Sequence, residues 1–424
     1  MQKLQWQTVS KRVNDLIPQD NNPRVITDKQ MSDLQRNLKR FNLVEIPAVD
    51  KDGRILAGHQ RIKALQLLGR GEEMIDVRLP NRKLTKSEAE RYLIASNSLG
   101  GDWNMDKLKS FDLDLLLDIG FDTSELSKFW DKDLEVQDDE FDEEAEIKKI
   151  HATDVKPGDI YALGKHRLIC GSSLDLSVVN KLMGSAKADM VNDDLPFNIG
   201  LSYDRGVGNK KGKYGGSTND SKTDSEYREF VKTIMQNAIS VSKPDCHYLF
   251  WCDERFVWLL QTLYKELSID SKRLLIWIKN NSTPTHNVAF NKVTEFCVYG
   301  TRGVAPINNE VSNLSEIANK GVDIGNESFD QILDLLNIWM VKRLPSKDYK
   351  HPTQKSPDLH EKALKRCTRP GDVVLDLTAG SGSILSACEQ LKRVAYLCEI
   401  EPIFCQVIIN RFQKLTGLKA KLIN

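Results

Sequence analysis

Residues 372–382, DVVLDLTAGSG, decide the fold of the larger part of the chain, since an apolar strand here runs into a turn of small residues and then into a helix. Gly380 and Gly382 allow a ligand to approach the backbone closely, and Asp376 at the strand tip can pair with a cationic or amine group. About 20 residues further on, a second strand ends at Glu399, the place of the ribose-binding acid in a nucleoside-binding βαβ unit. These residues predict a cofactor cradle, with NAD and S-adenosylmethionine both open.

Around this stretch, apolar strands alternate with helices from about residue 150 to the C-terminus. Such alternation predicts βαβ units, and therefore an α/β fold with a parallel sheet that helices cover on both faces. Ligands of such sheets bind at the carboxyl ends of the strands. The predicted strands are 161–171, 188–197, 246–252, 273–280, 294–300, 372–380 and 394–400, and the predicted helices are 224–242, 256–267, 356–367 and 383–392.

A further candidate segment, DMVNDDLPFNIG at 189–200, ends another strand of this sheet. Asp193 and Asp194 offer acceptors for an amino group, Pro196 fixes the turn, and Phe197 offers a face on which a planar ring can stack. The combination suits a base that is flipped out of a duplex. Standing alone, the same residues would more often form an ordinary strand end with a core phenylalanine.

The composition restricts the class of protein. The chain has 424 residues, 40% hydrophobic and 28% charged, and its formal net charge is zero. These values predict a globular protein of roughly two to four domains that does not coat nucleic acid through bulk charge. Without a long apolar run or the apolar core of a signal peptide, we expect a cytoplasmic protein with no membrane partner. The eight cysteines form no CxxC pair, which predicts reduced thiols and no metal site.

Residues 131–150 hold ten acidic residues against three lysines, a local net charge of −7. This composition predicts a solvated acidic linker between a first domain, 1–130, and a second, 151–424. The first domain is expected to be a small α+β module. Its predicted elements are helices at 26–42, 59–68, 85–97 and 106–117 and a hairpin at 46–58 around an Asp-Gly turn.

Four segments, in this order, resemble the motifs of amino-group DNA methyltransferases. Asp194-Leu195-Pro196-Phe197 resembles the catalytic DPPY or DPPF motif, and DLTAGSGS at 376–383 is similar to the D-x-F-x-G-S-G-T motif that binds S-adenosylmethionine. HPTQKSP at 351–357 is similar to the HPTxKP segment, and EIEPIFCQVIINRFQKLTG at 399–417 resembles the family's usual close. The catalytic motif comes first and the cofactor motif last, which is the permuted, β-type order. The resemblance therefore implies a permuted Rossmann-like fold over about residues 150–424.

The resemblance implies an enzyme that transfers a methyl group from S-adenosyl-L-methionine to adenine N6 of a flipped base in double-stranded DNA, because Asp at the first motif position is typical of adenine-N6 members. Leu195 departs from the motif by replacing its first proline, which removes the fixed φ that aims its carbonyl at the amine. Thr378 replaces the usual aromatic of the cofactor motif. The implied catalytic residues are Asp194, Leu195, Pro196 and Phe197, and the implied cofactor-binding residues are Asp376, Thr378, Gly380, Ser381, Gly382, Ser383, Glu399, His351, Thr353 and Lys355.

Basic residues among glycines follow the catalytic segment, at 204–220. We expect them to contact the DNA target strand, or to form a solvated loop that orders on binding. The candidate DNA contacts are Arg205, Lys210, Lys211 and Lys213. Residues 303–345 occupy the family's target-recognition position, but their sequence does not reveal the recognised site.

The first domain carries its own candidate site in Gly58-His59-Gln60-Arg61, between a predicted strand and a predicted helix. Gly58 permits close backbone approach and Arg61 lies in the first helical turn, which predicts a phosphate site at Gly58, His59 and Arg61. The module resembles the ParB/sulfiredoxin-like domain, whose G-x-x-R box contacts nucleotide phosphates. The box has no cysteine, which argues against sulfiredoxin chemistry. Packing of the helix start is the competing interpretation.

Together these features predict an adenine-specific DNA methyltransferase with an N-terminal ParB-like domain, of a type found in phages and mobile elements. We expect a homodimer and a nucleotide at the first domain, and the chain has no nuclease motif that would make it a restriction–modification enzyme by itself. Two alternatives remain open: cytosine-N4 methylation, and a ParB-like DNA-binding protein with a vestigial methyltransferase domain.

Overall fold

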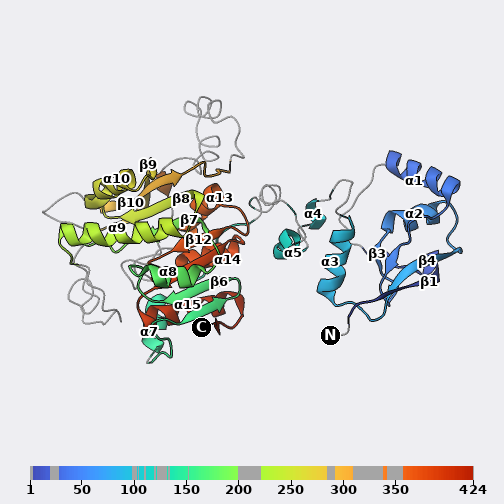
Figure 1. The fold of residues 1–424 in the computed structure, drawn as a ribbon, viewed down its shortest axis with the longest axis horizontal. Helices are drawn as coiled ribbons and strands as arrows, with labels where there is room; N and C mark the ends of the chain where they lie inside the picture. The colour runs from blue at the N-terminus through green and yellow to red at the C-terminus, as the bar shows by residue number, and fades with distance from the viewer. Residues whose placement is uncertain are drawn as a thin grey trace. The chain divides into compact units, whose positions relative to one another are not determined.

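The computed structural model describes residues 3–19, 28–97, 103, 105–108, 111–118, 121, 131, 134–150, 152–198, 221–283, 292–308, 338–340 and 357–423. Over this part of the chain there are two compact units, Met1–Phe129 and Trp130–Asn424 (Figure 1). None of the described helices is long and apolar enough to cross a membrane. The eight cysteines are free and buried, as predicted.

The first unit is a small α+β module. Its described elements are β1 (Trp6–Arg12), α1 (Asp28–Phe41), β2 (Ala48–Val49), β3 (Ile55–Ala57), α2 (His59–Leu67), β4 (Met74–Pro80), α3 (Lys86–Asn97), α4 (Met105–Leu108) and α5 (Leu113–Asp118). The described strands form one sheet in the order β1-β4-β2-β3. The predicted hairpin is confirmed, because β2 and β3 pair antiparallel and Gly53 in their turn has φ +84°. The helix predicted at 106–117 is instead two short helices, α4 and α5.

The second unit alternates strands and helices, as predicted. Its described elements are α7 (Glu143–Lys149), β5 (Ile160–Leu163), β6 (His166–Cys170), α8 (Leu176–Met183), β7 (Ala188–Asp194), α9 (Asp224–Ser240), β8 (Ser242–Cys252), α10 (Val257–Glu266), β9 (Asp270–Thr283), β10 (Lys292–Arg302), β11 (Ile338–Met340), α13 (Asp358–Cys367), β12 (Val373–Asp376), α14 (Ser383–Gln390), β13 (Val394–Glu399), α15 (Pro402–Thr416) and β14 (Lys421–Leu422).

The described strands of this unit form one sheet in the order β11-β9-β10-β8-β7-β12-β13-β6-β5-β14. Its middle is parallel, from β8 through β7, β12 and β13 to β6. The prediction of a parallel sheet is wrong at the sides, where β10 runs antiparallel to both β8 and β9 and β5 runs antiparallel to β6. Only a short connection separates β9 from β10 and β5 from β6, and a parallel pair would need a long crossover.

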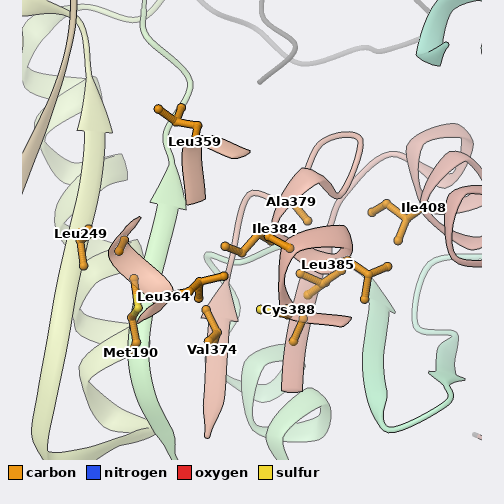
Figure 2. Close-up of a cluster of buried hydrophobic side chains, with 14 of the residues drawn as sticks. Met190, Leu249, Leu359, Leu364, Val374, Ala379, Ile384, Leu385, Cys388 and Ile408 are labelled. Carbon is orange, nitrogen blue, oxygen red and sulfur yellow. The ribbon is translucent and has the colours of Figure 1, made fainter. Parts of the chain in front are cut away.

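Helices cover both faces of this sheet, because alternate side chains of each central strand point to opposite faces. Val191 and Leu195 pack with residues of α8, α9 and α10. On the other face Met190 belongs to a core cluster that also contains residues of α13, α14 and α15. Figure 2 shows this second layer, with Met190 and Leu249 of neighbouring strands on one side and Ile384 and other residues of α14 beside them.

The acidic stretch 131–150 is not the solvated linker predicted from its composition. Asp131 forms a bidentate ion pair with Arg393, and Arg393 is fully buried. Asp139 forms a second with Arg411, which is 1% exposed and also donates to the Ser381 carbonyl. Its apolar residues Val136 and Phe141 are buried as well. Two buried arginines that lie far along the chain therefore dock this stretch on the second unit, which composition alone could not reveal.

Candidate active site

The three predicted acids of the second unit meet at one edge of the sheet. Asp194 ends β7, Asp376 ends β12 and Glu399 ends β13. β12 lies between the other two strands and runs parallel to both, so the three carboxyl ends point the same way. This is the edge at which parallel α/β sheets bind their ligands.

The tips of β7 and β12 are joined by hydrogen bonds around Thr378. Its hydroxyl lies 3.1 Å from the carbonyl oxygen of Asp194 and 3.3 Å from Asp193 Oδ1, and its backbone N–H donates to Asp376 Oδ1 at 3.0 Å. Asp193 Oδ1 also accepts from the backbone N–H of Leu377. Thr378, which replaces an aromatic in the resembling motif, thus connects the predicted catalytic strand to the predicted cofactor turn.

Burial dominates the electrostatics of this edge. It raises the pKa of Asp193 to about 6, and burial together with the charge of Asp193 raises the pKa of Asp376. Asp193 Oδ2 has no hydrogen-bond partner among the described residues, and the Asp376 carboxyl lies within hydrogen-bonding reach of Asp193. A proton shared between the two carboxyls would satisfy the buried oxygen and remove the repulsion.

Glu399 is buried and held by backbone donors. Its Oε2 accepts from the N–H of Gly380 at 2.8 Å and its Oε1 from the N–H of Glu401 at 2.9 Å. Burial raises its pKa to about 7. Each carboxylate oxygen can accept a second hydrogen bond, so Glu399 can hold a pair of hydroxyl groups while it stays anchored to the turn.

Space for a ligand lies beside the glycine turn. Gly380 has φ +52°, and a Cβ built on it would meet no atom of the described residues within 4 Å. Gly382, with φ +74°, instead packs against Ile408, where a Cβ would come to 3.0 Å. An open glycine flanked by Glu399 and Asp376 fits a nucleoside that carries a cationic amino-acid end, as S-adenosylmethionine does.

The turn after β7 is fixed by contacts that the sequence did not reveal. The side chain of Leu195 is 2% exposed and packs in the core against α9. The Tyr227 hydroxyl donates to the Pro196 carbonyl at 2.8 Å. Phe197 is partly buried against the opposite core layer. Packing of Leu195 and the Tyr227 hydrogen bond thus hold the backbone where the resembling motif has its first proline.

Asn198 ends this turn and adopts φ +52°. Its side-chain amide donates to the Lys222 carbonyl at 2.9 Å, and its side-chain carbonyl accepts from the Lys222 N–H at 2.7 Å. Arg255, which pairs with Asp253, donates to the backbone carbonyl of Asn198 at 3.1 Å. Asn198 therefore fastens the end of the predicted catalytic segment to the start of α9.

Several predicted site residues lie outside the described residues. The candidate DNA contacts and the HPTQK segment are among them, and only 303–308 and 338–340 of the predicted target-recognition region 303–345 are described. The residues concerned are Arg205, Lys210, Lys211, Lys213, His351, Thr353 and Lys355. Over the described residues, no group of three or more His, Cys, Asp or Glu side chains is arranged to hold a metal ion.

The Gly58 turn of the first unit differs from the Gly380 turn in its packing and in its charged residues. Gly58 has φ +94° and begins α2, and a Cβ on it would lie 3.0 Å from Pro47. Burial lowers the pKa of His59 to about 4, so this imidazole is neutral near neutral pH. Arg61 forms an ion pair with Glu45 and keeps about a third of its side chain exposed. The three predicted residues thus lie at one helix start, with one cation already paired.

Comparison with known proteins gives the family. A family profile described as DNA methylase, for N6 and N4 methyltransferases, matches residues 188–411. The chain is 22% identical over 242 residues to the type II methyltransferase M.HpaI of Haemophilus parainfluenzae, covering 54% of this chain and 68% of that protein.

Two solved structures are similar at low identity. M1.HpyAVI in complex with S-adenosylmethionine is 19% identical, has a TM-score of 0.38, and is matched over 57% of this chain and 97% of that chain. The cytosine-N4-specific PvuII DNA methyltransferase is 13% identical with a TM-score of 0.41, matched over 63% of this chain and 98% of that chain. The profile match, which spans more than half of the chain from β7 to α15, carries the conclusion. This chain belongs to the N6/N4 DNA methylase family, whose methyl donor is S-adenosyl-L-methionine.

Proposed function

We propose that the second unit methylates adenine N6 of a base flipped out of double-stranded DNA, with Asp194 acting on the acceptor and Asp376 and Glu399 holding the cofactor. The observation that carries the proposal is the pairing of the two strand tips. The Thr378 hydroxyl contacts the Asp194 backbone at 3.1 Å, so the acceptor-binding turn and the open glycine turn are neighbours. A methyl group bound at one can therefore meet an amine bound at the other.

The residues of the β7 turn orient the acceptor. Asp194 and the carbonyl of Leu195 accept the two N–H bonds of an exocyclic amine, which directs its lone pair toward the methyl donor. Phe197 offers its ring for stacking on the base. S-adenosyl-L-methionine supplies a methyl group on a cationic sulfur that leaves readily. Positioning therefore provides most of the rate, and the buried side chain of Leu195 supports the aim of its carbonyl.

The cofactor turn contributes acceptors and space. Glu399 is placed to accept hydrogen bonds from ribose hydroxyls, and Asp376 is placed to pair with the cationic end of the cofactor. Gly380, Ser381, Gly382 and Ser383 shape the turn between β12 and α14. As proposals carried by the sequence resemblance, His351, Thr353 and Lys355 complete the pocket.

Two finer parts of the proposal are the permuted order of the motifs and the choice of adenine N6 as the methylated atom. The catalytic strand β7 precedes the cofactor strand β12 in the chain although they are neighbours in the sheet, which supports the permuted arrangement. Aspartate at position 194 favours adenine N6 by its resemblance to adenine-specific members. Cytosine-N4 methylation and absence of transfer are the other outcomes of the test.

For the first unit we propose a ParB-like role in DNA engagement, with a phosphate of DNA or of a nucleotide at the Gly58–Arg61 turn. This rests on the sequence resemblance and on the Arg61 side chain at the start of α2, about a third of which is exposed. The basic residues Arg205, Lys210, Lys211 and Lys213 are proposed contacts to the target strand. A homodimer and a phage or restriction–modification setting belong to the same proposal.

Product analysis tests the proposed reaction. The full chain is incubated with methyl-labelled S-adenosyl-L-methionine and mixed-sequence double-stranded DNA, which is then digested to nucleosides and separated. We expect the label in N6-methyl-2′-deoxyadenosine. Label in N4-methylcytosine, or none in DNA although the cofactor binds, would contradict the proposal.

A further inference from the structure

A buried row of hydrogen-bonded side chains joins the catalytic strand to the cofactor turn. The indole N–H of Trp251 donates to Asn192 Oδ1 at 3.1 Å. Asn192 Nδ2 lies 3.1 Å from His360 Nδ1, and His360 Nε2 lies 2.9 Å from Ser383 Oγ. Trp251, Asn192 and His360 are 0%, 3% and 5% exposed, so water cannot readily replace a lost member of the row.

The chemistry of the donors fixes the direction of every bond. An indole nitrogen only donates, so the oxygen of the Asn192 amide faces Trp251 and its nitrogen faces His360. The amide nitrogen also only donates, so His360 Nδ1 must accept and the ring proton lies on Nε2. His360 is therefore neutral in this arrangement, and its Nε2–H donates to Ser383 Oγ.

The row connects the two segments that methyl transfer must keep aligned. Asn192 lies two residues before Asp194 on β7, so both side chains point to the same face of the sheet. Ser383 is the first residue of α14 and directly follows the glycine turn. His360 lies on α13, a third element that contributes no proposed catalytic residue.

We propose that His360 is a positioning residue for methyl transfer, which fixes the cofactor turn relative to the strand that carries Asp194. The inference rests on the proposed function for the identity of the reacting groups. A displacement of about 1 Å between reacting groups can cost roughly 100-fold in rate, so loss of this connection should affect turnover more than folding.

Three variants of the full chain test it. His360→Leu removes both hydrogen bonds, whereas His360→Gln keeps one acceptor and one donor on neighbouring atoms. We expect His360→Leu to lower kcat roughly 10- to 100-fold, and His360→Gln to recover most of it. His247→Leu is the control, since His247 is also buried but bonds Tyr299 and Pro306 in the middle of β8, level with Met190 and four residues before the level of Asp194. It should lower thermal stability with kcat per folded molecule unchanged.

A double-mutant cycle with Ser383→Ala supplies the decisive measurement. If His360 acts through Ser383, the double variant should be no slower than His360→Leu alone. Additive losses, or a folded His360→Leu variant with the kcat of the parent, would overturn the proposal. Should His360→Leu fail to fold, His360→Gln and Ser383→Ala test the same connection, because the proposal requires the serine variant to have a lower kcat per folded molecule than the parent.

Two further measurements separate this inference from the proposed function. Side-chain 15N NMR of labelled histidines should show His360 protonated on Nε2 near pH 7, and protonation on Nδ1 would contradict the row. Counting all methyl groups transferred to DNA, whatever the base, keeps the kcat comparison valid if the product is N4-methylcytosine. That product would refute the adenine assignment and leave the role of His360 standing.

Discussion

Each unit of this protein contains a strand that runs through a left-handed glycine into a helix, at Gly58 in the first and at the Gly380 turn in the second. At Gly58 an added Cβ would lie 3.0 Å from Pro47, whereas at Gly380 it would meet no described atom within 4 Å. One glycine permits close packing and the other leaves space. The same local sequence signal therefore serves two purposes, and only the surroundings distinguish them.

One buried carboxylate from each unit shows the same contrast. Asp50 in the first unit accepts hydrogen bonds from the backbone of Lys51 and Leu84, much as Glu399 does from Gly380 and Glu401. Of these two carboxylates, Glu399 alone lies next to an open glycine, on an edge that carries further acids. A buried carboxylate with two backbone donors thus indicates a ligand site only when space lies beside it.

The largest effect predicted by this contrast is on cofactor affinity. Glu399→Gln places an amide N–H against a backbone N–H and removes a carboxylate that can accept hydrogen bonds from ribose hydroxyls. The Kd for S-adenosyl-L-methionine should therefore rise roughly 10- to 100-fold. Asp50→Asn introduces the same chemical change in the first unit. Calorimetric titration should find its Kd unchanged and only its melting temperature lowered. Equal losses of affinity in the two variants would remove the distinction.

The glycines themselves give the next effect. Gly380→Ala adds strain of about 1 kcal/mol at positive φ and places a methyl group in the open space, so we expect a severalfold weaker Kd for the cofactor. Gly58→Ala has the same backbone strain and a contact with Pro47, which should lower the melting temperature without changing that Kd. Cofactor titration and thermal melts of both variants test these expectations. If Gly380→Ala bound the cofactor as tightly as the parent, the interpretation of Gly380 as an open turn would be contradicted.

A smaller effect concerns pH and the acids of the catalytic edge. Because burial raises the pKa of Asp193 to about 6, the folded state binds more protons than the unfolded state between about pH 4 and 6. Stability should therefore fall as pH rises through this window. Asp193→Asn can donate to Asp376 at every pH, so its melting temperature should exceed that of the parent by a few degrees at pH 8 and match it at pH 5. An identical pH dependence in both proteins would exclude the shared proton.

The smallest effect is expected at Arg61. If its guanidinium also holds a phosphate, Arg61→Ala should weaken DNA binding modestly and reduce the slope of log Kd against log salt by about 1. Glu45→Ala, which removes only the ion-pair partner, should leave that slope unchanged. Fluorescence anisotropy at several salt concentrations measures both. An unchanged slope in Arg61→Ala would leave the turn as a helix start only.

The sequence was sufficient to predict features that depend on residues close together in the chain. The strand tips at Asp194, Asp376 and Glu399 could be placed because each acid directly follows an apolar strand, and parallel strands bring such tips together. In the first unit, helical spacing and the Asp-Gly turn likewise predicted the hairpin and the helices, except at 106–117, where two short helices form. Local pattern was therefore sufficient to place these three acids at one edge of the sheet.

Long-range pairing is what the sequence could not reveal. Asp131 and Arg393 are 262 residues apart, and Asn192 and His360 are 168 residues apart, so no local pattern connects either pair. An acidic run is most often solvated, because burying a charge is costly unless a partner compensates it. The strand at β10 was predicted but its antiparallel direction was missed, since an apolar strand looks the same in either direction.

The proposed mechanism assigns Asp194 to the acceptor and assigns Glu399 and Asp376 to the cofactor. Its most direct test measures, on the same preparations, the Kd for S-adenosyl-L-methionine and the rate of methyl transfer at saturating cofactor for the parent, Asp194→Ala and Glu399→Gln. We expect Asp194→Ala to bind the cofactor nearly as the parent does but to transfer methyl groups roughly 100- to 1,000-fold more slowly. Glu399→Gln should instead lose affinity and recover much of its rate at saturation. Comparable loss of cofactor affinity in Asp194→Ala and Glu399→Gln would contradict this assignment.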